Sequence, residues 1–223
     1  MLEALSSSYY RQGLDETIIV TRSNKRANMF NMGVRNQILE REEELCTGDR
    51  LLVVKNNYYW GRQFDNLPFI ANGDMVVVRR ACEPYVKYGF RFAEVEIELL
   101  DYEIETDAVV LLDTLMSDGP SLTVESQQQL FANVMADYAG IPNQRDRIKA
   151  VKEDRHFNAL QIKYGYCVTC HKSQGGQWED VYLDLGHINP EHLGIDFYRW
   201  MYTAFTRARH TLYLVNMSDD MAE

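Results

Sequence analysis

The chain has 223 residues, of which 46% are hydrophobic and 25% charged, a balance that fits one large domain or one domain carrying an insertion. No apolar run approaches the roughly 20 residues that span a bilayer, and the first residues lack the features of a signal peptide, so we expect a cytoplasmic protein with no membrane partner. The net charge of −10 disfavours binding of nucleic acid through a broadly basic surface, although a few local donors in a narrow groove are compatible with it.

The first elements predicted in chain order are a strand and a helix. The β-branched run at 17–21 is typical of a buried strand. Ser23 is placed to cap a helix expected over about 25–43, because apolar residues recur there at near-helical spacing.

Short β-rich runs follow, with Asn and Gly between several of them. They lie at 50–56, 74–80, 92–100 and 107–113. Strands this short, separated by turn residues, predict a small β-barrel.

The α/β pattern returns after a break at 117–121. The expected elements are helices at 124–139 and 195–209 and strands at 164–169, 181–185 and 211–215, with an unassigned charged stretch at 143–157. We therefore predict an α/β fold in which a parallel sheet, with helices on both faces, is interrupted by an inserted β-barrel.

A polar loop, His171 to Gly176, follows the strand predicted at 164–169. Ligands of parallel α/β sheets bind at the carboxyl ends of strands, where backbone amides and short polar side chains can approach them. The Gly pair permits close approach of the backbone to a phosphate or a base. By itself, the pattern also fits an ordinary tight turn.

Arg207 lies near the end of the helix predicted at 195–209. A helix that aims a guanidinium at a neighbouring domain is how an arginine finger stabilises a transferring phosphoryl group. Packing of Tyr202 and Phe205 on a sheet would explain those two residues but not Thr203 or Arg207. Arg35, in the first predicted helix, is an unremarkable arginine unless it also meets a phosphate.

Three stretches, in this order, resemble motifs IV, V and VI of superfamily 1 DNA helicases. They are TRSNKRANMFNMGVR, VTCHKSQGGQWEDVYLDL and YTAFTRARHTLYLV. The likeness is to the RecD-like branch with a UvrD-type C-terminal domain. It implies a second RecA-like motor domain at 1–45 and 150–223, and a small Src-homology-3-like barrel with a helical segment inserted at 46–149.

The resemblance also implies roles for single residues. Arg207 matches the motif VI arginine finger and Arg35 the motif IV arginine, both directed at the γ-phosphate of ATP. Gly175 matches the motif V glycine near the nucleotide, and Gln177 stands where the family often has a glutamate that meets the ribose. The positions that face the DNA strand are Thr169, His171 and Lys172.

The nucleotide-binding half of such a motor is not recognisable. The sequence has no G-x-x-x-x-G-K-[ST] motif and no Gly-Lys pair, and the apolar run ending at Asp113 is interpreted as a structural strand. ATP and Mg²⁺ are therefore expected only in an intact motor that includes an N-terminal RecA-like domain, from the same native chain or from a partner. This chain alone is expected not to hydrolyse ATP.

Other functions remain open at this point. Cys167, Cys170 and His171 fit the C-x-x-C-H pattern of haem attachment, but the alternation around them suits a buried strand, and the remaining Cys and His lack the ligand spacing of a zinc site, so no metal is expected. The alternative class is a free-standing module that binds single-stranded nucleic acid or docks on a partner. Its candidate surface is a loop with Tyr58, Tyr59, Trp60 and Phe64 beside Arg62, whose rings can stack bases or simply pack the barrel.

Overall fold

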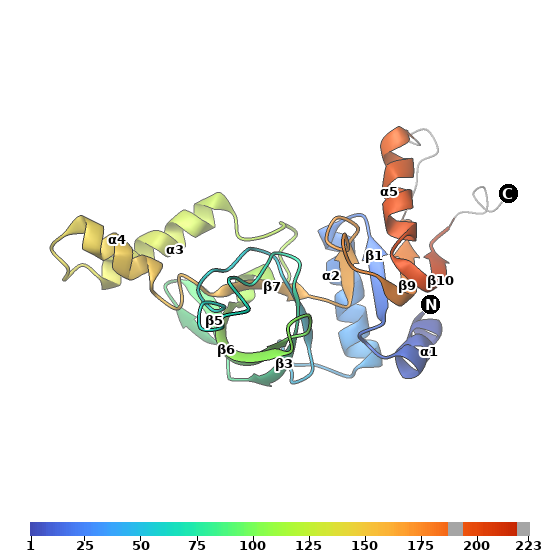
Figure 1. Cartoon of the computed structure of the whole chain (residues 1–223), viewed down its shortest axis with the longest axis horizontal. Helices are drawn as coiled ribbons and strands as arrows, with labels where there is room; N and C mark the ends of the chain where they lie inside the picture. Colours follow the sequence, from blue (N-terminus) through green and yellow to red (C-terminus); the bar gives the residue numbers. More distant parts are fainter. Residues whose placement is uncertain (187–193, 218–223) are drawn as a thin grey trace. The chain divides into compact units, whose positions relative to one another are not determined.

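The computed structural model describes residues 1–186 and 194–217. The chain divides into two units, Met1–Glu42 with Gly165–Glu223, and Glu43–Tyr164 (Figure 1). We call them the sheet unit and the barrel unit. The barrel unit begins and ends at other residues than the predicted insertion at 46–149, because residues up to Tyr164 supply a barrel strand.

The sheet unit contains a four-stranded parallel sheet with the order β10-β9-β1-β8. Its strands are β1 (Thr17–Thr21), β8 (Cys167–Thr169), β9 (Trp178–Asp184) and β10 (Ala208–Val215). All five residues of β1 are buried between β9 and β8, which explains its β-branched composition. The strand predicted at 17–21 and the parallel sheet are confirmed.

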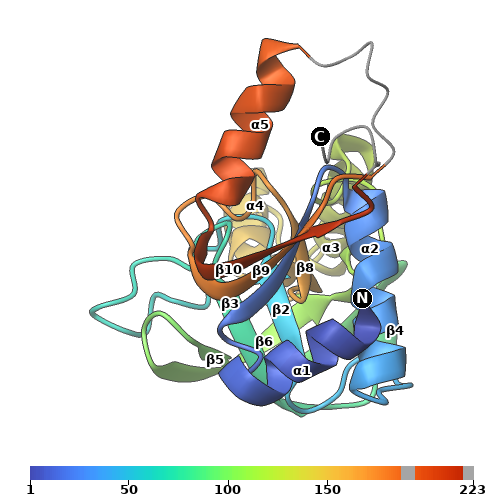
Figure 2. The same ribbon diagram turned by 90° about the vertical axis from the view of Figure 1, so that its right-hand side faces the viewer.

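The helices of the sheet unit are α1 (Leu2–Gln12), α2 (Asn24–Gly33), followed by a π-helical turn (Val34–Ile38), and α5 (Ile195–Phe205). The Ser23 cap is confirmed, since its side chain accepts a hydrogen bond of 3.3 Å from the Arg26 amide. The predicted helix end at 43 is wrong, because Glu40 adopts a φ of 52° that no right-handed helix continues. In Figure 1 and Figure 2, α5 extends away from the sheet.

The barrel unit is built from six strands. They are β2 (Arg50–Val53), β3 (Met75–Ala81), β4 (Tyr85–Lys87), β5 (Phe90–Leu99), β6 (Ile104–Leu111) and β7 (Leu160–Tyr164). Pairing of β3 with β5 closes five of them, in the order β3-β2-β7-β6-β5, into the expected β-barrel. The single strand predicted at 164–169 is wrong, because β7 belongs to the barrel and β8 to the parallel sheet.

Two helices cover one part of the barrel. They are α3 (Val124–Asp137), capped by Thr123, and α4 (Gln144–Lys152), capped by Asn143. Leu130 and Val134 of α3 pack with Phe92 and Leu111 of the barrel in one buried cluster. Among the described residues, no helix is long and apolar enough to cross a membrane.

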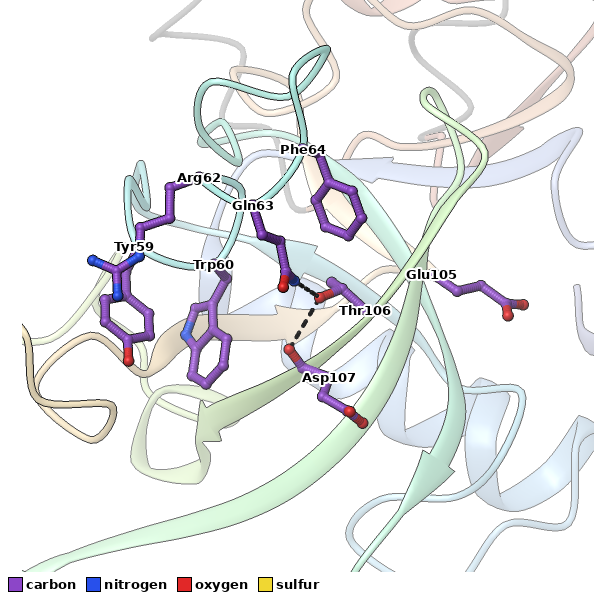
Figure 3. A pocket seen from close by; sticks show the side chains of 8 residues that line it. All are labelled: Tyr59, Trp60, Arg62, Gln63, Phe64, Glu105, Thr106 and Asp107. Atoms are coloured by element: carbon purple, nitrogen blue, oxygen red, sulfur yellow. Dashed lines mark hydrogen bonds between the residues drawn. The ribbon is translucent and has the colours of Figure 1, made fainter.

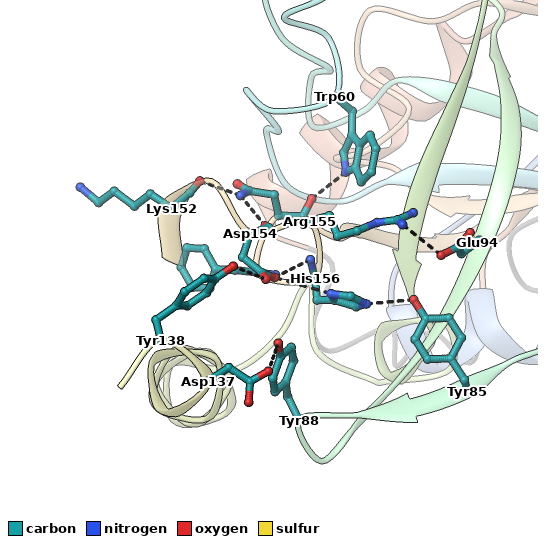
Figure 4. Close-up of polar contacts among 12 residues, drawn as sticks. Trp60, Tyr85, Tyr88, Glu94, Asp137, Tyr138, Lys152, Asp154, Arg155 and His156 are labelled. Atoms are coloured by element: carbon teal, nitrogen blue, oxygen red, sulfur yellow. Dashed lines mark hydrogen bonds and ion pairs between the residues drawn. The ribbon is translucent and has the colours of Figure 1, made fainter. Parts of the chain in front are cut away.

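A buried histidine joins the segment after α4 to the β4–β5 hairpin (Figure 4). His156 Nε2 lies 3.0 Å from the Tyr85 hydroxyl, and its Nδ1 lies 3.6 Å from a carboxylate oxygen of Asp154. Burial, and then the charge of Lys87, lower the pKa of His156, which favours the neutral imidazole. Asp154 accepts a hydrogen bond of 3.0 Å from the Tyr138 hydroxyl, so a connected polar network links the segment after α4 to the β4–β5 hairpin.

Asp184, at the carboxyl end of β9, joins the main elements of the sheet unit. Its fully buried carboxylate accepts hydrogen bonds from Thr21 at 3.1 Å, from Arg26 Nη2 at 2.7 Å and from Asn216 at 2.6 Å. Burial alone would raise the pKa of Asp184, but the hydrogen bonds from Arg26, Asn216 and Thr21 outweigh it, and the pKa is lowered. The ends of β1, β9 and β10 are therefore tied to α2 through one side chain.

Replacement of this carboxylate tests its role. We expect Asp184→Asn to lower the free energy of unfolding by about 3 kcal/mol at pH 7, because it leaves the Arg26 guanidinium without its buried counter-charge. Since the pKa of Asp184 is lower in the folded chain than its unfolded value of about 3.9, the contribution is present above about pH 4 and disappears as the pH falls through the folded value.

Urea unfolding at pH 7 and at about pH 3 measures the free energy of unfolding of the unaltered chain and of Asp184→Asn. The difference between the two free energies should be smaller at the lower pH. Asp196→Asn is the control, because the Asp196 side chain is 91% exposed. An equal loss of unfolding free energy in Asp184→Asn and Asp196→Asn at pH 7 would contradict the structural role given to Asp184.

Candidate functional site

The loop from Cys170 to Gln177 connects the carboxyl end of β8 to the amino end of β9. The strand register defines the two ends, since Thr169 lies beside Thr21 and Asp180 beside Thr17. The loop therefore runs from the side of the sheet where the parallel strands end to the side where they begin. The two groups of predicted site residues lie at the two ends of this loop.

The positions predicted to face DNA lie at the first end of the loop. The carbonyl of Thr169 accepts hydrogen bonds from the amides of Lys172 at 2.8 Å and Ser173 at 3.1 Å, which closes a tight turn. His171 is exposed at this turn, whereas Lys172 is half-buried. Burial lowers the pKa of Lys172. The structure thus brings Thr169, His171 and Lys172 together at the carboxyl edge of the sheet.

Arg207 lies at the second end of the loop, between α5 and β10. Its guanidinium donates hydrogen bonds to the carbonyls of Gly176 at 3.0 Å, Ser173 at 3.4 Å and Thr203 at 2.9 Å, and to the Thr206 hydroxyl at 3.0 Å. All four acceptors are neutral, and within residues 1–186 and 194–217 no carboxylate pairs with Arg207. Its positive charge is fixed in position without being neutralised.

The other two positions predicted to meet the nucleotide lie beside Arg207. Gly175 is exposed, with a φ of +88° that favours glycine. Gln177 donates from its side-chain amide to the carbonyl of Thr206 at 3.2 Å. Between them, a Cβ on Gly176 would lie 2.4 Å from the Trp178 ring, so any side chain at this position would displace the ring. Gly175, Gln177 and Arg207 form one group.

Arg35 is placed differently from Arg207. It lies in the π-helical turn, and only 1% of its surface is exposed. Its carbonyl accepts a hydrogen bond of 2.8 Å from the Arg41 amide. In this structure Arg35 is an interior residue and does not present its guanidinium at the surface.

A cavity beside His171 contains residues that the sequence analysis did not select. It has a volume of about 680 Å³, and its lining includes Arg22, Phe197 and Trp200. Arg22 directly follows β1, at the carboxyl end of a parallel strand, and this position in the sequence could have indicated a site residue.

The cysteines of the C-x-x-C-H pattern face the interior. Cys167 lies in β8 with 1% of its surface exposed, and burial raises its pKa well above the ordinary value. Burial also raises the pKa of Cys170. In the part of the chain that the structure describes, no three His, Cys, Asp or Glu side chains gather where they could hold a metal ion. Buried, protonated thiols are typical of strand residues.

The aromatic loop of the barrel unit, which Figure 3 shows beside Thr106 and Asp107, is held by contacts with other segments of the same unit. The Trp60 indole donates to the carbonyl of Asn158 at 2.8 Å. Arg62 lies over the Tyr59 ring at 4.1 Å and pairs with Glu153. A cavity of about 420 Å³ beside this loop is also lined by Glu105 and Asp107, whose charges would repel a phosphate backbone. These contacts favour a packing role for Tyr59 and Trp60, whereas Tyr58 is exposed.

Comparison with known families finds one match in this region. Residues 164–215 match the family model of the UvrD-like helicase C-terminal domain. This segment covers β8, the Cys170–Gln177 loop, α5 and β10. It is similar to the C-terminal domain of superfamily 1 helicases. No curated protein matches the chain.

Comparison with solved structures finds helicases among the similar chains. Pif1 helicase from Bacteroides, in complex with ADP-AlF3 and ssDNA, is 12% identical with a TM-score of 0.47, over 93% of this chain and 42% of that one. Pif1 helicase from Candida albicans is 14% identical with a TM-score of 0.45, over 97% of this chain and 50% of that one. The chain thus spans half or less of the length of these helicases.

Proposed function

We propose that this chain is the C-terminal half of an ATP-dependent superfamily 1 DNA helicase or translocase of the RecD-like branch, with a Src-homology-3-like barrel inserted in its second RecA-like domain. One observation carries the proposal. The guanidinium of Arg207 is bonded to the carbonyls of Ser173 and Gly176, in the same loop that presents His171 and Lys172. The positive charge of Arg207, suited to a nucleotide, and the donors of His171 and Lys172, suited to a DNA strand, therefore belong to one connected segment. That segment matches the UvrD-like family model.

At the nucleotide end, Arg207 is the proposed arginine finger, with Gly175 and Gln177 beside it. The chain offers a positive charge to a phosphate, but its sequence has no P-loop to hold ATP and Mg²⁺. Those groups would be held by an N-terminal RecA-like domain, and bound ATP would supply the phosphoryl group for transfer. Because Arg35 is buried, the proposal rests on Arg207 and gives Arg35 a role only if the intact motor exposes it.

At the strand end, Thr169, His171 and Lys172 are the proposed contacts to single-stranded DNA. His171 is exposed and can donate to a phosphate or a base edge. The partly buried ammonium of Lys172 adds a point charge, whose phosphate contact would release a counter-ion and depend on salt. Closure of the motor on ATP would move Arg207 and this loop together, because they share hydrogen bonds.

The purified chain should be inactive as an ATPase. We expect no ATP hydrolysis with or without single-stranded DNA, because no residue of the sequence forms a phosphate-cradling P-loop. A phosphate-release assay measures this directly. Turnover that is abolished by Arg207→Ala would contradict the proposal that a second domain is required.

Substitutions at the two ends of the loop should have different effects in a motor that also contains the P-loop domain. Arg207→Ala should reduce DNA-stimulated hydrolysis by about 10³-fold or more, with little change in nucleotide-free DNA affinity. His171→Ala should weaken DNA binding about fivefold, as expected for one lost polar contact, and leave basal hydrolysis intact. Lys172→Ala should flatten the salt dependence of binding.

Anisotropy of labelled oligonucleotides, run beside the phosphate-release assay, measures these effects. Arg145→Ala is the control, because Arg145 is exposed on α4 in the barrel unit and its loss removes the same charge. Each variant should be compared only if its thermal unfolding midpoint matches that of the unaltered protein, because Arg207 also holds the Cys170–Gln177 loop. Loss of DNA binding with normal hydrolysis in Arg207→Ala would overturn the proposed role of this arginine.

A further inference from the structure

We infer that the cavity between Arg22, His171 and α5 holds an unpaired nucleobase of the bound strand, stacked on a platform made by Arg22 and Trp200. The inference rests on the proposed function and deepens it, because it names the chemical group that the sheet unit grips. The stacking residues Arg22 and Trp200 were not among the predicted DNA contacts, which are Thr169, His171 and Lys172.

The cavity lies at the carboxyl edge of the parallel sheet. Arg22 follows the last residue of β1, and His171 lies in the turn after β8. One face of α5 closes the other side through Phe197 and Trp200. A volume of about 680 Å³ is within the range of small-ligand sites and can accept a base with part of its sugar.

Three side chains form a layered platform in this cavity. The Arg22 guanidinium carbon lies 5.5 Å from the centre of the Phe197 ring and 5.3 Å from that of Trp200. The two rings are 6.0 Å apart and inclined by 27°. Phe197 is buried, Trp200 is half-buried and Arg22 is exposed, so the planar groups become more accessible toward the outside. Bases stack on aromatic rings and on guanidinium planes alike.

The charge of the lining suits a nucleotide. Arg22, His171 and Arg199 line the cavity with one carboxylate, Asp196, which lies 3.3 Å from Arg199. Arg22 has no carboxylate partner in the described ranges. On a chain with a net charge of −10, this cavity is a local cationic site, and a phosphate beside a stacked base would be attracted to it.

The Trp200 indole nitrogen supports a role for the ring face. Its Nε1 is buried and has no hydrogen-bond partner in the described structure. A buried donor without an acceptor destabilises the fold, and a phenylalanine in this position would avoid that cost. The presence of tryptophan is explained if its larger aromatic face is used for stacking, the property in which it exceeds the smaller rings.

The test uses the 223-residue chain and two labelled oligonucleotides of about 12 nucleotides, a length that such single-strand sites occupy. One is oligothymidine, and the other has abasic sites in place of the bases but the same phosphates. We expect the chain to bind oligothymidine about tenfold more tightly than the abasic strand, because a stacked base contributes that much. Trp200→Leu should remove this difference, whereas Trp200→Phe, which keeps a ring, should retain most of it.

Tyr202→Leu is the matched control, because Tyr202 is on the same helix, is 73% exposed and does not line the cavity. It should bind both strands as the unaltered chain does. Equal binding of the two strands by the unaltered chain, or an equal loss for both in Trp200→Leu, would overturn base stacking and leave the proposed function standing. Failure of the unaltered chain to bind either strand would overturn both the inference and the proposed DNA contacts.

Discussion

The buried carboxylate of Asp184 is the interaction on which the sheet unit depends. It receives hydrogen bonds from the end of β1 through Thr21, from α2 through Arg26 and from the residue after β10 through Asn216. A charge buried this completely is tolerated only when it is paired and bonded, so these elements must keep one arrangement. The carboxyl edge of the parallel sheet is fixed as a result. Arg22, the next residue after Thr21, is thereby placed opposite α5.

The same sheet positions the Cys170–Gln177 loop, which connects two chemically different regions. Its first residues lie at the carboxyl edge with His171 exposed, and its last residues bond the Arg207 guanidinium. The Trp178 ring packs over Gly176, and a side chain at this position would displace it. Neutral carbonyls orient the guanidinium without cancelling its charge. These hydrogen bonds tie the last part of the loop to the residue that precedes β10.

Local patterns predicted most strands, because the side chains of each β-rich run are buried within a short stretch of sequence. They failed where distant contacts decide. The polar helix α1 was not predicted, since it is held by a hydrogen bond of 2.8 Å between the hydroxyls of Ser8 and Tyr182, which are far apart in the sequence. Local periodicity also continued through Glu40, whose left-handed backbone ends the helix. At the site, motif resemblance found Arg207 and the loop, but the approach of Arg22 to Trp200 is a tertiary contact that no local pattern contains.

In the proposed motor, Arg207 joins nucleotide binding to DNA binding. The most direct test is the affinity for single-stranded DNA of a motor containing the P-loop domain, measured with and without a non-hydrolysable ATP analogue. Coupling between such sites is commonly 5- to 150-fold, that is about 1–3 kcal/mol. The account predicts that Arg207→Lys, which keeps the charge but not the fork of donors, loses this nucleotide-dependent change and retains the nucleotide-free affinity. An unaltered nucleotide-dependent change in Arg207→Lys would contradict it.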